Sequence, residues 1–380
     1  MPIQNYEQID INTDVTTTRT LLHEVIPMTG TIVSGTYSDN NIKNYTHGMF
    51  QSVYDYPYLS SSANHIFDIS CGFTSTATYS GPGAGPAGSR PTLSASCNLN
   101  GVQNAKKINM YNQFAQTLLG YKDSAANTIE TFESDLNITD DNAQMTSCYF
   151  ITLSRLLMKE QIKRGSFSMT LGTGSYRYGY PTSSGYSQVL IDASASSGTG
   201  GGFKSGLPGG DYGVLYVSGA SPQTASGVIF YQSGIIVLTS SFTQAVHGSS
   251  WGTSSMFSAS GGGPTSYNSL QTMVTGTISG SCDVIRRRIQ NISFNNTTEI
   301  NSKIYFCRVP HNKYNYSSNP TYTSASKIQV KDLASDPPLS YITTVGLYNS
   351  NNELLAVAKL SEPLRKDPTN ELTLRVRLDY

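Results

Sequence analysis

The feature that most constrains this chain is the alternation of apolar and polar side chains in ELTLRVRLDY, residues 371–380. Leu372, Leu374, Val376 and Leu378 alternate with Thr373, Arg375, Arg377 and Asp379. Successive side chains of a β-strand point to opposite faces, so the pattern predicts a strand with one apolar face. That face must be buried, and we therefore expect the segment to be held in a sheet rather than to fray.

The preceding residues predict a β-hairpin. YITTVGLY (341–348) and ELLAVAKL (353–360) are rich in strand-forming residues, and NSNN between them tolerates turn geometry. Pro363 and Pro368 then predict an extended, non-helical connection to the last strand. Because the alternation is imperfect in LLAVA, we expect protein to cover both faces of this hairpin.

Composition favours a structural or binding protein. Charged residues make up 13% of the 380 positions, about half of the roughly 25% that is usual for a globular domain. Uncharged polar residues replace them, which is common in large static assemblies and also fits secreted or carbohydrate-binding β proteins. The 25 basic residues balance 25 acidic ones, so no long-range field attracts nucleic acid or a membrane, and we expect neither as a partner.

Periodicity predicts a mainly β (α+β) chain with β-sandwich or barrel-like regions, a few helices in the N-terminal half and a C-terminal antiparallel β module. We expect an N-terminal α+β region at 1–147, a Gly/Ser-rich β region at 148–280 and a C-terminal β domain at 281–380. Their length suffices for two or three cores. Helices are predicted at 105–119 (ended by Gly120), more weakly at 124–135, and from Ser154 to Gly165. CYFITL (148–153) predicts a buried strand, and 79–91 and 195–211 predict loops.

No motif for catalysis, a cofactor or a metal stands out. The cysteines, Cys71, Cys97, Cys148, Cys282 and Cys307, form no CxxC pair. An odd set without close pairs indicates reduced, mostly buried thiols made in a reducing compartment. No signal peptide and no apolar run of about 20 residues is evident in the sequence. We therefore expect no cofactor and no metal site, whereas a glycosidase-type pair of carboxylates cannot be recognised without a local motif and stays open.

Two local features have both a structural and a functional interpretation. Trp251 in HGSSWG is either the aromatic anchor of a loop or a contact for a carbohydrate or a partner. Arg286, Arg287 and Arg288 lie in VIRRRIQNISF, which resembles a strand. These arginines either form a solvated edge that prevents aggregation or make a charged contact with a neighbouring subunit.

Several segments together resemble a known family. They are YFITLSRLLMKEQIKRGSFSMTLG, DYGVLYVSG, RVPHNKYNYSSNPTY, YITTVGLYNSNNELLAVAKLSEPLRKD and LRVRLDY, scattered over residues 148–380. The sequence resembles virion structural proteins of contractile-tailed, T4-like bacteriophages, especially marine and cyanobacterial ones. The resemblance implies a non-enzymatic tail component, in the first place of the baseplate wedge. A neck, capsid-decoration or fibre-attachment role comes second.

On this basis we expect a homo-oligomeric tail protein of the virion, assembled in the host cytoplasm, whose partners are other tail and baseplate proteins and copies of itself. The residues predicted to contact neighbours are Arg286, Arg287, Arg288, Tyr341, Tyr348, Arg375, Arg377 and Tyr380. The competing class is a receptor- or glycan-binding β module that uses Trp251 and nearby tyrosines. A polysaccharide depolymerase is a third.

Overall fold

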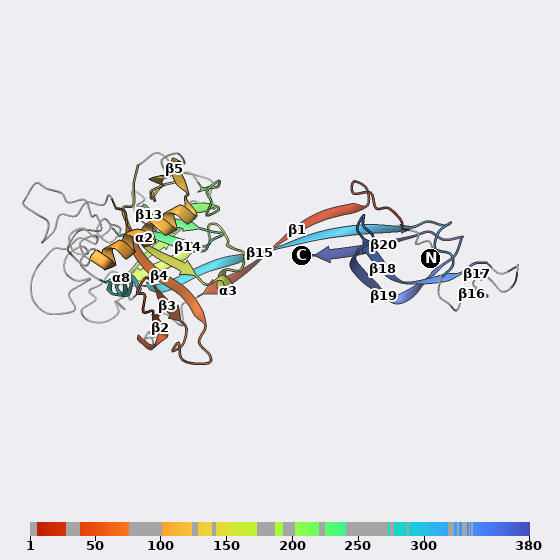
Figure 1. Ribbon diagram of the computed structural model, residues 1–380, viewed down its shortest axis with the longest axis horizontal. Coiled ribbons are helices and arrows are strands. Elements are labelled where there is room, and N and C mark those ends of the chain that lie inside the picture. The colour runs from red at the N-terminus through yellow and green to blue at the C-terminus, as the bar shows by residue number, and fades with distance from the viewer. Residues whose placement is uncertain are drawn as a thin grey trace, which may run out of the picture. The chain divides into compact units, whose positions relative to one another are not determined.

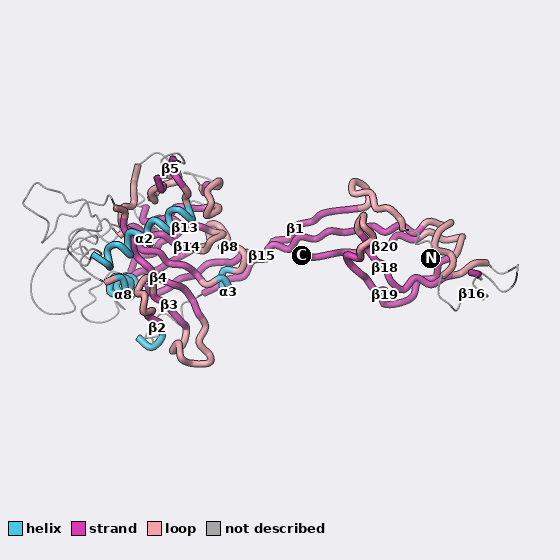
Figure 2. The backbone as a smooth tube through the Cα atoms, in the orientation of Figure 1, coloured by secondary structure: helices cyan, strands magenta, loops and turns pink. Residues whose placement is uncertain are grey.

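The computed structural model describes residues 6–27, 39–75, 101–123, 128–138, 142–172, 187–192, 202–219, 225–240, 273, 277–286, 289–317, 323–324, 327–328, 333, 335 and 337–380. In this part of the chain the protein is mainly β (Figure 2), which confirms the predicted fold class. The described α-helices are α2 (Gly101–Leu118), α3 (Arg155–Met158) and α8 (Ile278–Arg286), and η1 (Asp39–Asn41) is a 3-10 helix.

The chain divides into two compact units (Figure 1). The central unit is His23–Thr298, and the C-terminal unit combines Met1–Leu22 with Glu299–Tyr380. Both boundaries fall inside strands, since β1 spans Val15–Pro27 and β15 spans Ile289–Val309. The three ranges predicted from sequence do not coincide with these units, and that division of the chain stays a prediction.

An antiparallel sheet organises the central unit. Its strand order is β15-β9-β10-β12-β13-β14-β7-β4-β3-β2. The bounds are β2 (Ile42–Asn44), β3 (Gln51–Tyr54), β4 (His65–Phe73), β7 (Ser147–Leu153), β9 (Ser168–Gly172), β10 (Ser187–Ile191), β12 (Tyr212–Val217), β13 (Ala225–Phe230) and β14 (Ile235–Thr239). Shorter strands are β5 (Tyr121–Asp123), β6 (Thr128–Ile129), β8 (Gln161–Ile162) and β11 (Phe203–Lys204). The buried strand predicted at 148–153 is confirmed as β7.

Apolar cores lie on both faces of this sheet. One cluster combines Ile69 and Ile151 of β4 and β7 with Met169 of β9, and it includes Cys282 of α8. Strands far apart in the order therefore share one core, so the sheet curves around it. The opposite face of β4, β7, β13 and β14 packs against α2 (Figure 1), with Phe150 and Tyr111 in the second cluster. Burial on both faces explains why β7 reads as a continuous apolar run.

Helix α2 approaches the sheet closely at Gly72 of β4. A methyl group at Gly72 would lie 2.5 Å from the backbone oxygen of Lys107 and 2.9 Å from the backbone nitrogen of Tyr111. The helix ends as predicted at Gly120, which adopts φ +92° and donates its N–H to the carbonyl of Ala115 at 3.1 Å. Glycine reaches this left-handed conformation without the steric cost of a side chain.

The helix predicted from Ser154 to Gly165 is mostly wrong. Only Arg155–Met158 are helical, and the Ser154 side chain makes no capping hydrogen bond. The chain then turns at Lys159, where φ is +58°, and β8 pairs with β15 through Ile162 and Asn296. Pairing with a distant strand therefore overrides local helix propensity. The helix at 124–135 is also wrong for residues 128–135, where β6, a β-bridge at Glu133 and other non-helical backbone lie, while 124–127 are outside the described residues.

The strand predicted for VIRRRIQNISF (284–294) is wrong up to Arg286, which lies in a helix, and is confirmed from Ile289 onward. Helix α8 covers Ile278–Arg286, outside the N-terminal half in which helices were expected, and β15 begins at Ile289. Ile278, Cys282 and Ile285 are each 1% exposed or less. Their spacing places them on one helical face, which packs against β4.

Candidate functional site

The last strand of the C-terminal unit is held along its whole length. Strand β20 (Leu372–Asp379) pairs antiparallel with β15, from Val309 opposite Leu372 to Ser302 opposite Asp379. Tyr380 and Asn301 then exchange both backbone hydrogen bonds, at 2.9 and 3.0 Å. Val376 is buried, its apolar neighbours are half-buried, and the four polar residues between them are exposed. The predicted alternation and anchoring are confirmed.

The register also shows which backbone groups of β20 point away from β15. In an antiparallel pair, residues that exchange hydrogen bonds alternate with residues that do not. Because Tyr380 exchanges bonds with Asn301, the backbone groups of Thr373, Arg375 and Arg377 point to the other side. No second described strand pairs with β20. These residues therefore present an open strand edge, which we call the β20 edge.

The predicted hairpin is confirmed as β18 (Ser340–Tyr348) and β19 (Leu354–Lys366). Asn349 organises the turn, since its Oδ1 accepts from the backbone N–H groups of Asn351 and Glu353 at 2.9 and 2.8 Å. Asn352 adopts φ +61°, a conformation that asparagine tolerates well. Pro363 lies within β19 at a register shift, where a missing N–H does not interrupt the ladder.

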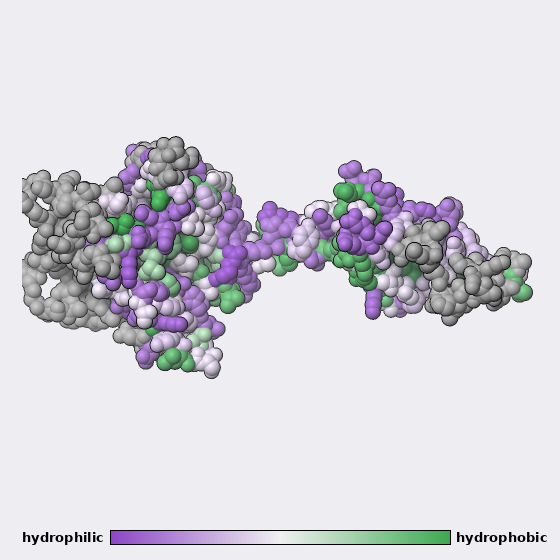
Figure 3. Space-filling model, in the orientation of Figure 1, coloured by the Kyte–Doolittle hydropathy of each residue, from purple (hydrophilic) through white to green (hydrophobic). Residues whose placement is uncertain are grey.

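One expectation about the hairpin is wrong within this chain, because neither of its faces is fully covered by the described residues. Leu355 is 68% exposed and Val357 is 52% exposed. Tyr348 and Leu354 lie beside Gly346, which pairs with Val357, and the Tyr6 ring lies 5.0 Å from that of Tyr348. We call Tyr6, Tyr348, Leu354, Leu355 and Val357 the hairpin patch. Hydrophobic atoms are visible on the surface around β18 and β19 (Figure 3).

Most residues predicted to contact neighbours lie on the surface of the C-terminal unit. Tyr341 is 55% exposed and Tyr380 is 67% exposed, and Tyr348 belongs to the hairpin patch. Arg375 and Arg377 are exposed on β20. Arg377 forms an exposed ion pair with Asp379 at 2.7 Å, which contributes little to stability.

Arg286 does not fit the predicted contact surface. It is 1% exposed on α8 and pairs with Asp283 at 2.7 Å. Asp283 also accepts from the Gln51 side chain at 3.0 Å. A buried, paired guanidinium of this kind fixes the helix against β3 instead of facing a neighbour. Arg287, Arg288 and Trp251 lie outside the described residues, as does the loop at 79–91 and the part of the second loop before residue 202.

Sequence reasoning missed a buried lysine in the C-terminal unit. Lys366 ends β19 and is 0% exposed. Its ammonium donates to the carbonyl of His311 at 3.2 Å, to Oδ1 of Asn315 at 2.6 Å and to the carbonyl of Asp367 at 2.7 Å. All three donors are therefore satisfied, and Lys366 ties the turn after β15 to the end of the hairpin. No local pattern distinguishes it from the exposed Lys359.

The buried titratable groups of the central unit have structural partners. Asp192 is fully buried and accepts hydrogen bonds from the N–H groups of Gly165 and Phe167 and from the hydroxyl of Tyr231. Burial raises the pKa of the Asp192 carboxyl, and these hydrogen bonds oppose that shift. Among the described residues, no group of three or more His, Cys, Asp or Glu side chains is arranged to hold a metal ion.

None of the described helices is both long enough and apolar enough to cross a bilayer. Comparisons of the chain with protein-family models, with curated proteins and with solved structures found no match.

Proposed function

We propose that this protein is a structural component of a tailed-phage virion, in the first place of the baseplate wedge, and that it acts through protein–protein contacts. The phage assignment rests on the sequence resemblance of the segments between residues 148 and 380. The observation that supports a contact role is that one unit carries both the β20 edge and the exposed hairpin patch.

Each feature provides a different part of a contact. An open strand edge binds another strand through backbone hydrogen bonds, which supply affinity without requiring particular side chains. An apolar patch contributes by removing its surface from water, at about 25 cal/mol per Å². Neighbouring tail proteins and copies of this chain are the proposed partners, joined during assembly in the host cytoplasm.

The first test changes the hairpin patch without disturbing the fold. Val357→Asp places a charge on an exposed position, so the C-terminal unit should fold normally while a contact through the patch fails. In a phage complementation assay we expect at least a roughly tenfold loss of incorporation into particles, measured by quantitative immunoblot. Leu59→Asp, at a position 86% exposed in the central unit, is the matched control. Equal incorporation of both variants and the natural protein would contradict a role for the patch.

A second test separates the two sides of β20. Proline removes one backbone N–H, and it is tolerated in an edge strand where that N–H is not part of the ladder. Arg375→Pro removes a group that points outward, whereas Val376→Pro removes one that pairs with Tyr305. We expect Arg375→Pro to fold but to lose particle incorporation, and Val376→Pro to destabilise the unit because it removes a hydrogen bond of the ladder. A folded Arg375→Pro protein with full incorporation would show that the edge is not used.

The position of the chain in a particle reconstruction tests the virion assignment itself. We expect the density of residues 341–380 to contact a neighbouring subunit in the tail. Deleting these residues should abolish incorporation. If purified particles of a phage that encodes this chain lack the protein by mass spectrometry, the proposal is wrong.

A further inference from the structure

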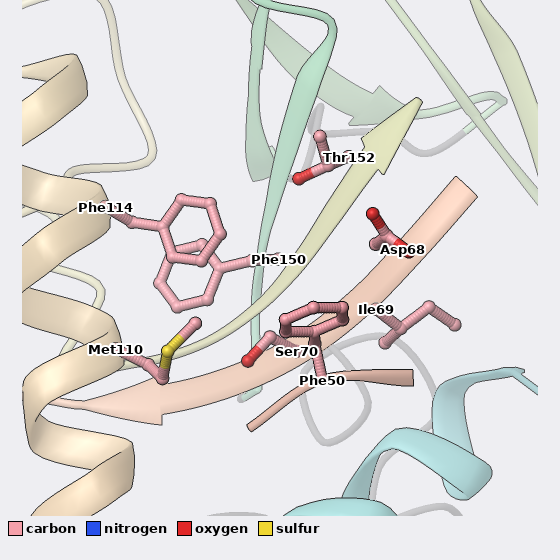
Figure 4. A pocket seen from close by; sticks show the side chains of 8 residues that line it. All are labelled: Phe50, Asp68, Ile69, Ser70, Met110, Phe114, Phe150 and Thr152. Atoms are coloured by element: carbon pink, nitrogen blue, oxygen red, sulfur yellow. The ribbon is translucent and has the colours of Figure 1, made fainter. Parts of the chain in front are cut away.

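A cavity of about 230 Å³ lies at the face of the central sheet that α2 partly covers (Figure 4). Its apolar wall includes Phe50, Met110, Phe114 and Phe150. Its polar wall is formed by Asp68, Ser70 and Thr152. The cavity is smaller than the roughly 300 Å³ at which sites for drug-sized ligands begin, so its size suits a single side chain or a fragment of similar size.

Strand register explains this division. Asp68 of β4 lies opposite Thr152 of β7, and Ser70 lies opposite Phe150 in the next pair on the same face. Helix α2 covers the second pair, where the Phe114 and Phe150 rings stack at 4.3 Å and 8°. In Figure 4 this ring pair lies on the helix side of the cavity, and Asp68 and Thr152 lie on the opposite side.

The Asp68 carboxylate is held in place but keeps one oxygen available. Its Oδ1 accepts from the Ser52 hydroxyl at 2.5 Å and contacts Nε2 of His65 at 2.9 Å. Ser52 in turn lies 3.1 Å from the hydroxyl of Tyr45. No hydrogen bond from a described residue reaches Oδ2, and the side chain is 32% exposed. The carboxylate is therefore preorganised to accept from an incoming donor.

The chemistry of the walls favours a cation with an apolar stem. Aromatic faces attract cations and pack well against methylene groups. A carboxylate oxygen forms its strongest hydrogen bonds with charged N–H donors. A sugar ring would need several convergent polar groups, but the Ser70 hydroxyl already donates to the carbonyl of Met49 at 2.6 Å. We propose that the cavity binds the tip of a lysine or arginine side chain presented by a partner protein.

The test uses small probes, so its outcome does not depend on the virion proposal. The full chain is labelled with ¹³C at its methionine methyl groups, and Met110, which lines the cavity, reports occupancy by NMR. We expect n-butylammonium and n-propylguanidinium to shift the Met110 signal, with Kd on the order of 10 mM. The neutral 1-pentanol should bind with a Kd at least about tenfold higher than that of n-butylammonium. Methyl α-glucoside should not shift the Met110 signal.

The pH of the titration matters because His65 shares the carboxylate. The hydrogen bond that the imidazole of His65 donates to the Asp68 carboxylate raises the pKa of His65 above its ordinary value. A higher pH favours the neutral imidazole, and at pH 8.5 an alkylamine with a pKa of about 10.4 stays charged. A smaller fraction of protonated His65 then competes with the probe for the Asp68 carboxylate.

Two variants distinguish the carboxylate from the aromatic wall. Asp68→Asn keeps the shape of the side chain and should raise the Kd for n-butylammonium by about tenfold. Phe50→Leu keeps an apolar wall and should raise it by about threefold. Asp55→Asn, a carboxylate of the same unit outside the cavity, should leave it unchanged. The Met110 signal of each free variant shows that it has folded.

Several results would overturn the inference. These are a Met110 signal that no cation shifts at 100 mM, equal Kd values for n-butylammonium and 1-pentanol, or a stronger shift with methyl α-glucoside. The last result would identify the cavity as a glycan site instead.

Discussion

Replacing Gly72 by alanine is expected to lower the free energy of unfolding of the central unit by about 3 kcal/mol. The new methyl group would meet the backbone of α2 at Lys107 and Tyr111, within 2.5 and 2.9 Å. A backbone cannot rotate away as a flexible side chain can, so the helix must shift from the sheet. Urea denaturation monitored by hydrogen exchange of β4 and α2 measures the loss.

Gly280→Ala provides the matched control for this substitution. Gly280 lies in α8, and among the described residues an added methyl would lie within 4 Å only of the Thr277 hydroxyl, at 3.2 Å. Alanine is favoured over glycine in a helix by up to about 1 kcal/mol, so this variant should be neutral or slightly stabilised. Equal stability of Gly72→Ala and the natural protein would show that α2 packs less closely than described.

Replacing Lys366 by methionine is expected to destabilise the C-terminal unit by about 3 kcal/mol. The substitution keeps the volume of the side chain but removes the ammonium. The acceptors on His311, Asn315 and Asp367 then lose a buried donor. Hydrogen exchange of residues 311–317 and 364–367 should accelerate roughly a hundredfold, measured by mass spectrometry.

Lys359→Met tests whether loss of charge alone has this effect. Lys359 belongs to the same strand but is exposed, and its replacement should change stability by less than about 0.5 kcal/mol. Equal exchange rates in the two variants would contradict the structural role of Lys366.

The C-terminal unit was largely predictable because its signals are local. Alternation from Leu372 to Leu378 specified which face of β20 is buried, and NSNN specified the hairpin turn. The exposure of Leu355 and Val357 was not predictable in the same way. An apolar run in a strand indicates that both faces avoid water, but it does not say whether the same chain or another one provides the cover.

The errors in the central unit arose where distant partners decide the structure. Residues after Met158 have helix-forming side chains, yet Ile162 pairs with Asn296 of β15. For α8 the sequence did contain a usable signal, namely the helical spacing of Ile278, Cys282 and Ile285. The β-branched residues on both sides of the arginines in VIRRRIQNISF favoured a strand instead.

No sequence motif predicted the cavity. Its lining comes from short segments around residues 50, 68–70, 110–114 and 150–152, which only the strand register and the docking of α2 bring together. Asp68 has no neighbour in the sequence that marks it as different from other acidic residues. Its preorganised carboxylate depends on Ser52, which reaches it from the adjacent strand.

The β20 edge has a consequence for how freely its sequence can diverge. Main-chain N–H and C=O groups are the same at almost every residue, so they do not restrict which side chains occupy Thr373, Arg375 and Arg377. Only the alternate positions, which face the core, must stay apolar. A docking edge built from backbone groups can therefore be retained while its exposed residues are replaced. Comparison of sequences alone would then detect such an edge poorly.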